Sequence, residues 1–219
     1  MVTGHRWGRR GVLGAGLTLA LAGCNGAMVR IGQTVSKQLY DDDPGIKLEQ
    51  IDAIPYSSLI ARVGSGPTSI IVLGTIQGED RHWFSADKSV IVTRNGRVVQ
   101  TANFPSDLAH TSFFDADPIS SRVPVQPQTI LRRQIDIVPG NFFGINIVSH
   151  FVVASQPEAL TVYGKSYNVI KIIENCKAEQ VSWEFTNTYW QDVATGLICK
   201  SVQYYVPASP PMELAVGRL

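Results

Sequence analysis

Short segments of β-capable residues follow one another along most of the chain, separated by glycine, proline and asparagine. Several of them alternate apolar and polar side chains, which is the period-two pattern of a strand with one buried face. Others are nearly continuous apolar runs, as expected of strands covered on both sides. The segments expected to form strands are 56–63, 69–76, 81–85, 89–94, 97–102, 130–138, 145–154, 160–163, 167–176, 181–190 and 197–206.

Two connections between these segments carry specific turn signals. Asn95 and Gly96 separate two alternating runs, and both residue types tolerate the positive φ angles of a type I′ turn, so we expect a tight hairpin. Gly196 ends the turn that begins at residue 192 and is placed for the left-handed position of a bulged hairpin. The stretch 104–128 has a weaker pattern and contains four prolines; we expect a long surface excursion with one helical turn near 106–110.

These signals together predict an all-β fold: an antiparallel β-barrel, or a barrel-like sandwich, of about ten strands. No helix separates the strands, and neither an internal repeat nor a linker divides them, so residues 46–219 are expected to form one domain. Apolar residues at helical spacing between positions 27 and 40 predict a short N-terminal helix within an anchor and linker segment, residues 24–45.

The first 23 residues have the parts of a bacterial lipoprotein signal peptide. Three arginines and no acid precede a run of small and apolar residues, Gly11–Gly23, which is too short to span a membrane as a mature helix. Residues 21–24 read LAGC, the lipobox in which small residues admit the signal peptidase and the cysteine thiol receives diacylglycerol. We therefore predict lipid attachment at Cys24, with acyl chains that anchor the protein to a membrane.

The same segment bears on export route and destination. Arg9 and Arg10 begin a stretch that resembles a twin-arginine core, but Gly8 stands where Ser or Thr is usual, so general secretion is favoured and the twin-arginine route stays open. Asn25 follows the lipobox cysteine, whereas the retention rule of enteric bacteria requires Asp for the inner membrane. This predicts the periplasmic leaflet of the outer membrane.

Composition and charge exclude several classes of protein. The chain is 44% hydrophobic and 17% charged, which does not fit intrinsic disorder. Its 19 Lys+Arg nearly balance 18 Asp+Glu, and loss of the three arginines of the signal peptide makes the mature chain slightly acidic. A nucleic-acid binder would show a basic face or arm, so nucleic acid is not an expected partner.

Catalytic and metal-binding motifs are lacking in the sequence. His82, His110 and His150 are far apart and form no ligand-spaced pair, so we predict no metal site. Residues 64–66 (GSG) do not make a nucleophile elbow, and neither a phosphate loop nor a dinucleotide fingerprint is present. We expect no enzymatic activity and no cofactor.

Paired acids are the one pattern that a glycosidase could use. Asp115 lies near Asp117, and Glu174 and Glu184 fall in neighbouring predicted strands. Sequence spacing cannot establish the separation of ~5–10 Å that such chemistry requires. An enzyme acting on glycans therefore remains open, as the weakest of the alternatives.

The cysteines that follow Cys24 give opposing signals. An oxidising periplasm favours a bond between Cys176 and Cys199. A simple meander would instead place Cys176 opposite about Val181 and Cys199 opposite about Tyr189, roughly 26 Å apart along the strands at ~3.3 Å per residue. Because a disulfide needs Cα atoms within ~7 Å, either the bond is absent or the sheet bends to change this register.

Aromatic residues are concentrated near the end of the chain. Alternation places Trp183 and Phe185 on one face of their strand, with Glu184 on the other. These rings either fill a barrel core or form a surface that stacks on sugars or lipids. If they bind a ligand, the candidates are Trp183, Tyr189 and Trp190.

Several of these motifs, in this order and behind a lipobox, resemble one known family. They are residues 54–59 (IPYSSL), 83–87 (WFSAD), 92–99 (VTRNGRVV) and 185–196 (FTNTYWQDVATG). The order is similar to that of the YjbF/GfcB family, the lipoproteins of group 4 capsule and exopolysaccharide gene clusters. The likeness covers the mature chain and is weakest at 104–130. Val193 replaces a proline that is usual in the last motif.

The resemblance implies an all-β periplasmic lipoprotein needed for secretion or assembly of capsular or extracellular polysaccharide. Its implied partners are other proteins of such a cluster, including an outer-membrane exporter, and the polysaccharide itself. No catalytic residues can be carried over, and only Cys24 transfers as a functional position. The hypotheses are a non-enzymatic accessory factor or, alternatively, a carrier or chaperone that holds a lipid or glycan in an apolar cavity of the barrel.

Overall fold

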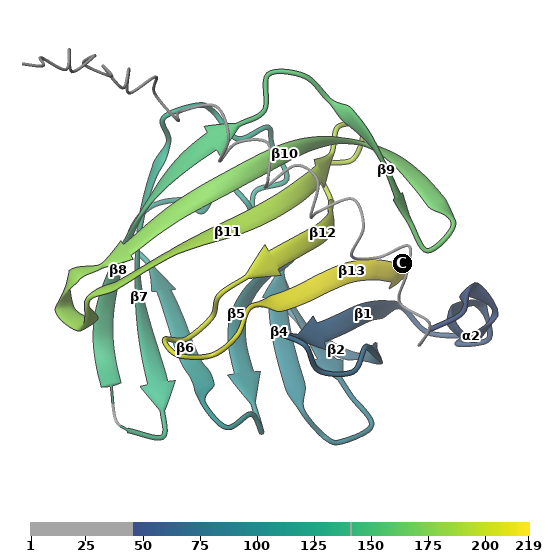
Figure 1. The fold of residues 1–219 in the computed structure, drawn as a ribbon, viewed down its shortest axis with the longest axis horizontal. Helices are drawn as coiled ribbons and strands as arrows, with labels where there is room; N and C mark the ends of the chain where they lie inside the picture. The colour runs from purple at the N-terminus through teal and green to yellow at the C-terminus, as the bar shows by residue number, and fades with distance from the viewer. Residues whose placement is uncertain (1–45, 141) are drawn as a thin grey trace, which may run out of the picture. The chain divides into compact units, whose positions relative to one another are not determined.

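The computed structural model describes residues 46–140 and 142–219, which fold into a nearly closed antiparallel β-barrel (Figure 1). Its elements are α2 (Leu48–Asp52), β1 (Ser58–Val63), β2 (Ser69–Gln77), β3 (Asp80–Phe84), β4 (Val90–Arg94), β5 (Arg97–Ala102), β6 (Asp107–Phe113), β7 (Ile130–Val138), β8 (Phe142–Val153), β9 (Glu158–Val162), β10 (Lys165–Ala178), the 3-10 turn η1 (Glu179–Val181), β11 (Trp183–Asp192), β12 (Ile198–Gln203) and β13 (Met212–Arg218). The predicted fold class is confirmed.

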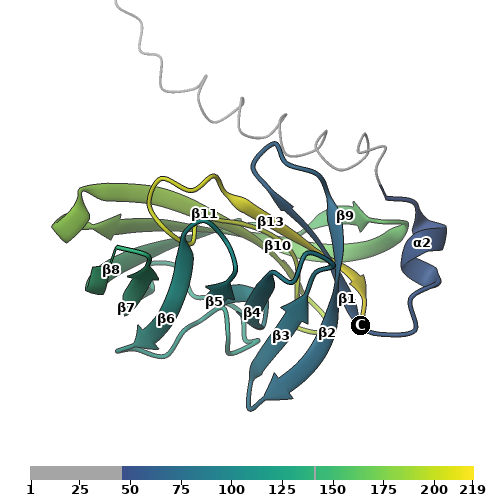
Figure 2. The same ribbon diagram turned by 90° about the horizontal axis from the view of Figure 1, so that it is seen from below.

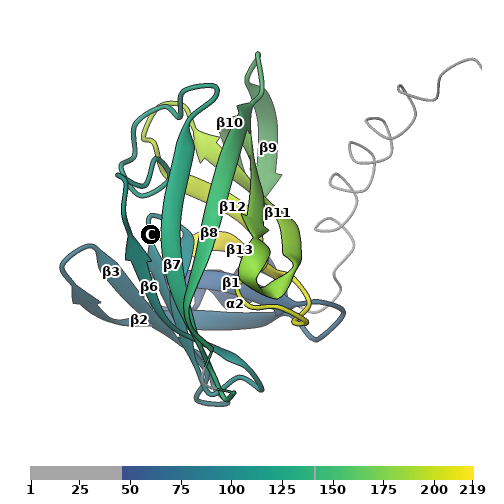
Figure 3. The ribbon, with the colours of Figure 1, turned by 90° about the vertical axis from the view of Figure 1, so that its left-hand side faces the viewer.

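One sheet contains all of these strands, in the order β5-β4-β3-β2-β1-β13-β12-β11-β10-β8-β7-β6, and β9 pairs with the first part of β10. Figure 2 shows β10, β11 and β13 on one side of the barrel and β4 to β7 facing them. The β2–β3 hairpin projects beyond the neighbouring strands (Figure 3), and Ile76 near its tip is exposed.

The prediction of about ten strands was too low, because the sheet has thirteen. Two strands lay outside the predicted segments. β13 follows a proline-rich turn at the end of the chain and pairs with both β1 and β12, which links the first strand to the last hairpin. β6 replaces the helical turn predicted near 106–110. β6 ends the sheet and pairs through its backbone with β7 alone, and most of its side chains are half-buried. The alternation of apolar and polar residues along this strand is therefore weak.

The two ends of the sheet, β5 and β6, meet without a ladder of backbone hydrogen bonds. Side chains join them instead: Thr111 Oγ1 donates to the carbonyl of Val99 at 2.8 Å, and the Leu108 amide donates to Thr101 Oγ1 at 2.9 Å. From inside the barrel, the Gln203 side chain accepts from the Val98 amide. The same side chain donates to the Gly96 carbonyl at 2.7 Å. We call this junction the β5–β6 seam.

Inward side chains fill the barrel. On β7 and β8 the strictly alternating burial places Ile135, Ile137, Ile145 and Ile147 in the interior. The segment 114–129 does not simply cross the surface, as was expected: Ile119 and Val125 are buried with Tyr189, Ile172 and other interior residues. Its prolines prevent strand formation, but its apolar residues are still buried. The segment therefore covers one end of the barrel.

The two predicted hairpin turns are present, and the cysteines do not lie opposite the expected residues. Asn95 and Gly96 have φ angles of 41° and 85°, and Gly196 has φ 70°, so both hairpin predictions are confirmed. Cys176 and Cys199 are free and buried. The expected register was wrong by a few residues. Cys176 lies opposite Phe185, because the turn after β10 comes later in the chain than expected. Tyr189 lies opposite Ser201, and a bulge follows Trp190.

The predicted signal peptide, Cys24 and the helix expected between 27 and 40 lie outside the described residues. A short helix that was not predicted, α2, precedes β1; its Ile51 side chain is fully buried. In the described part of the chain, no helix has the length and apolar character needed to cross a bilayer.

Candidate functional site

A cluster of buried polar side chains lies inside the barrel, around Arg97. The Asn95-Gly96 turn reverses the chain so that Arg94 pairs with Arg97, and the next strand begins with the Arg97 side chain directed inward. That side chain is only 2% exposed, which is unusual for arginine and requires compensating partners.

Asp117 provides the first partner. Arg97 Nε donates to Asp117 Oδ2 at 2.7 Å and Nη2 donates to Oδ1 at 3.0 Å, a bidentate geometry that combines charge with two hydrogen bonds. Asp117 belongs to the segment that covers the end of the barrel and also accepts from the amide of Ile119. The ion pair therefore fastens this segment to β5.

Glu174 on β10 provides the second partner and is fully buried. Arg97 Nη1 donates to its Oε2 at 3.0 Å, and Arg133 Nη1 donates to its Oε1 at 2.6 Å. The Asn187 side-chain amide and the Tyr189 hydroxyl each donate to Oε2 at 3.0 Å. One carboxylate thus connects β5, β7, β10 and β11.

The charges in this cluster balance, since Arg97 and Arg133 face Asp117 and Glu174. Burial by itself raises the pKa of Glu174, but the nearby guanidinium groups of Arg133 and Arg97 outweigh it and hold that pKa well below its usual range. Burial also raises the pKa of Tyr189 far above its usual value. Glu174 stays ionised and Tyr189 stays neutral near pH 7, so neither is poised for proton transfer.

The low pKa of Glu174 makes the stability of the fold depend on pH. Because the pKa is lower in the folded chain, the contribution of Glu174 is complete above its ordinary value of 4.5 and is lost as the pH falls below it. We expect the free energy of unfolding, measured with urea across this range, to fall more steeply with decreasing pH in the wild type than in Glu174→Gln. Equal slopes for the two chains would contradict this role.

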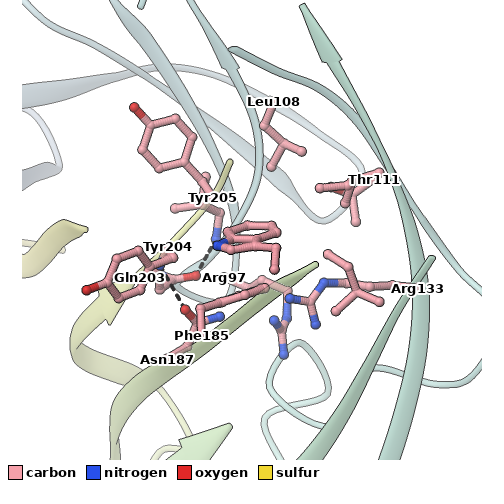
Figure 4. A pocket seen from close by; sticks show the side chains of 13 residues that line it. Arg97, Leu108, Thr111, Arg133, Phe185, Asn187, Gln203, Tyr204 and Tyr205 are labelled. Carbon is pink, nitrogen blue, oxygen red and sulfur yellow. Dashed lines mark hydrogen bonds between the residues drawn. The ribbon is translucent and has the colours of Figure 1, made fainter. Parts of the chain in front are cut away.

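A small pocket with a cavity volume of about 20 Å³ lies beside the cluster (Figure 4). Arg97, Arg133, Asn187 and Gln203 form its polar side. Its remaining walls are mostly aromatic and aliphatic, and include Trp183, Phe185, Tyr204 and Tyr205. Figure 4 shows Arg133 extending into the pocket from β7, opposite Tyr204 and Tyr205.

The three candidate binding residues are not brought together. Trp183 lies in the pocket wall, where its ring stacks on Phe185 at 3.8 Å between centroids. Tyr189 is fully buried in the polar cluster. Trp190 is buried outside the barrel interior, in a cluster with Cys199. There the ammonium groups of Lys171 and Lys200 lie 5.6 and 4.9 Å from the centroid of its ring. Only Trp183 is placed to meet a ligand in this pocket; the binding roles stay predictions.

The paired acids do not face a common cleft. Asp117 is in the buried cluster, whereas Asp115 accepts hydrogen bonds from Arg132 on the surface. Glu174 is fully buried, whereas Glu184 is exposed beside Lys177. The described residues contain no group of three or more His, Cys, Asp or Glu side chains that could hold a metal ion.

Sequence reasoning missed the main polar residues of the interior: Arg97, Arg133, Asn187 and Gln203. The signal that could have revealed them was their position on the inward face of a predicted strand. Arg133, for example, lies between Leu131 and Ile135 on the inward face of an alternating strand, where a charged residue needs a buried partner. Two of the motifs quoted above, 92–99 and 185–196, supply Arg97, Asn187 and Tyr189 to the cluster.

Fold and site together define the class of the molecule: an antiparallel barrel whose interior is filled by its own side chains around a neutral cluster of buried charges. Comparison with known proteins then identifies the family. Residues 15–216 match the model described as "Group 4 capsule polysaccharide lipoprotein gfcB, YjbF", and the chain belongs to this family, as the motifs predicted.

Two curated relatives and one solved structure illustrate the relationship, all from Escherichia coli K12. The chain is 27% identical to the uncharacterized lipoprotein GfcB over 90% of this chain and 92% of the relative. It is 23% identical to the uncharacterized lipoprotein YjbF over 86% and 88%. The crystal structure of the hypothetical lipoprotein YmcC matches with a TM-score of 0.72 and 26% identity, covering 85% of this chain and 94% of that one. None of these names describes an enzymatic activity.

Proposed function

We propose that this protein is a non-enzymatic accessory factor in the secretion or assembly of capsular or extracellular polysaccharide. The observation that carries the proposal is that the chain belongs to a family whose description names the group 4 capsule polysaccharide. The acids inside the barrel support a non-enzymatic role, because Glu174 and Asp117 are engaged in ion pairs rather than open to a substrate.

Lipid attachment at Cys24 would hold the protein at the periplasmic leaflet of the outer membrane. The lipobox supports this anchor, and the relatives are named lipoproteins. At that membrane the partners would be other proteins of a polysaccharide export cluster and the polymer itself. A carrier for a lipid chain is less well supported, because the pocket beside the cluster has a cavity volume of only about 20 Å³, which is room for about one water molecule.

Deletion of the gene is expected to abolish or strongly reduce surface polysaccharide, and complementation with the wild type is expected to restore it. A Cys24→Ala chain should fail to restore the polymer, because it lacks the anchor that holds the protein at the export site. The amount and length of surface polymer would be measured, with immunoblots as the control for equal protein levels. Unchanged polymer in the deletion strain would refute the export role, and full restoration by Cys24→Ala would refute the need for an anchor.

A further inference from the structure

We infer that the turn between β7 and β8 inserts two phenylalanine side chains into the membrane surface and so sets the orientation of the anchored barrel. The two residues are Phe142 and Phe143, which we call the aromatic tip. The inference rests on the proposed function, because it requires the lipid anchor at Cys24. It depends on four features of the tip: its exposure, the lack of charge in the surrounding sequence, its place at one end of the barrel and its small size.

The aromatic tip leaves two large apolar side chains in contact with solvent. Phe142 is 54% exposed and Phe143 is 64% exposed. Among the residues that the structure describes, no other two neighbouring positions both carry an exposed large apolar side chain. Single residues of this kind are ordinary on a protein surface, whereas an adjacent pair at a turn indicates a contact with a partner or a membrane.

The sequence around the tip lacks charge. Between Asp136 and Glu158 the chain contains no Asp, Glu, Lys or Arg. Phe114, which is exposed to a similar degree, is instead followed directly by Asp115. Because charged side chains are costly to bring into a bilayer, an uncharged turn can enter its surface far more readily than a charged one.

Hydrogen bonds fix the backbone directly behind the tip. The Gly144 amide donates to Asp136 Oδ1 at 2.8 Å, and the Gln180 side-chain amide donates to the Gly144 carbonyl at 3.3 Å. The Asn146 amide donates to Gln180 Oε1 at 2.6 Å. Residues on both β7 and the β10–β11 turn therefore hold the start of β8, so the tip is positioned before it meets a membrane.

The tip lies at the end of the barrel that the segment 114–129 does not cover. Asp107 pairs with Val138 where β6 begins and β7 ends, so the β7–β8 turn belongs to this end (Figure 1). Phe113 pairs with Arg133 toward the other end, and the covering segment begins at the next residue. A tip at one end can touch a bilayer without the barrel wall lying on it.

The predicted anchor does not by itself fix which end of the barrel meets the membrane. Residue 46, the first that the structure describes, follows Cys24 by 22 positions. A chain of this length reaches at most about 75 Å, which is enough to let the barrel turn any face to the lipid. A second contact at the aromatic tip removes this freedom and directs the 114–129 end away from the membrane.

The small area of the tip favours a membrane over a protein partner. One aromatic side chain buries about 150–250 Å², so two offer less than the ~800 Å² per partner of a stable protein interface. Insertion into a bilayer surface needs no such area when a lipid anchor already holds the protein there. The tip therefore suits a supporting contact that orients an anchored molecule.

Fluorescence quenching on the lipidated mature chain tests this inference. The protein is added to preformed vesicles of phosphatidylethanolamine and phosphatidylglycerol that carry a nitroxide quencher at a shallow position of the acyl chains. Phe143→Cys carries an environment-sensitive fluorophore, and Phe114→Cys, at a residue 61% exposed toward the other end of the barrel, is the matched control. Cys176 and Cys199 are buried, and the wild type taken through the same labelling corrects for any reaction at them. Because inserted apolar groups reach about 5–10 Å into the bilayer surface, we expect quenching at position 143 to exceed that at 114 by at least about twofold.

Hydrogen exchange measures the same contact without a probe. We expect the β7–β8 turn to exchange more slowly in the wild type on vesicles than in a soluble Cys24→Ser chain. The 114–129 segment should exchange equally in both. A lipidated chain with Phe142→Ser and Phe143→Ser keeps the anchor and should lose the slower exchange of the turn.

Equal quenching at positions 143 and 114 overturns the inference, as does exchange of the turn that vesicles leave unchanged; the tip would then be open to a protein partner. If mass spectrometry finds no acyl chains on the purified protein, the anchor is refuted and the inference fails with it. These results are separate from the test of the export role: an anchored chain with a free tip leaves that role intact, and insertion of the tip does not rescue it if deletion leaves the polymer unchanged.

Discussion

Replacement of Arg97 by methionine is expected to lower the free energy of unfolding by about 3–5 kcal/mol. The substitution removes the guanidinium that pairs with both Asp117 and Glu174, whose side chains are 4% and 0% exposed. Asp117 would then be a buried carboxylate without its bidentate partner, and Glu174 would keep only Arg133. Methionine fills similar space, so the loss would reflect the charges and hydrogen bonds. Urea denaturation at neutral pH measures the effect.

Arg132→Met is the matched control for this experiment. Arg132 also pairs with a carboxylate, that of Asp115, at 2.8 Å, but its side chain is 63% exposed. Solvent and salt screen such a pair, and we expect a nearly unchanged free energy of unfolding. A similar loss in both variants would show that burial of the Arg97 cluster does not determine its contribution.

Gly196→Ala is the second substitution with a large expected effect. Gly196 has φ 70°, where an L side chain costs roughly 1–2 kcal/mol, and a Cβ atom there would lie 2.0 Å from the backbone oxygen of Arg122. The clash involves backbone and cannot be relieved by a side-chain rotation. We expect the turn after β11 to separate from the 114–129 segment, with a loss of stability well beyond the strain alone. Thermal unfolding followed by circular dichroism measures it.

Gly78→Ala separates the two contributions. Gly78 has a similar φ of 61°, and nothing lies within 4 Å of the position of its Cβ. It therefore carries the backbone strain without the clash, and its loss should remain about 1–2 kcal/mol. Equal destabilisation by the two substitutions would show that the contact of Gly196 with Arg122 is unimportant.

Local pattern was sufficient for most of the fold. The strand Ile130–Val138 was predicted at its observed bounds, because its inward residues alternate strictly with outward ones. The Asn95-Gly96 and Gly196 turns were predicted because their backbone angles restrict the choice of residue. β6 could not be found in this way, since an end strand with half-buried side chains leaves little alternation.

The site was harder to predict because it depends on contacts between residues far apart in the sequence. Arg97 and Glu174 are separated by 77 positions, and no spacing rule connects them. Asp117 was considered only as a partner for Asp115, whereas the fold pairs it with Arg97. The aromatic residues were predicted as a group. The alternation that directs Tyr189 inward directs Trp190 to the other face of the sheet, so these two residues lie in different buried clusters.

The β5–β6 seam affects whether copies of this barrel can associate through their sheets. A sheet edge with free amides and carbonyls is a template for pairing with another chain. Gln203 binds the Val98 amide of β5 and the Gly96 carbonyl in the turn just before it, and Thr111 binds the Val99 carbonyl. These two side chains occupy groups through which neighbouring barrels would otherwise join edge to edge, and so they disfavour assembly through this part of the sheet.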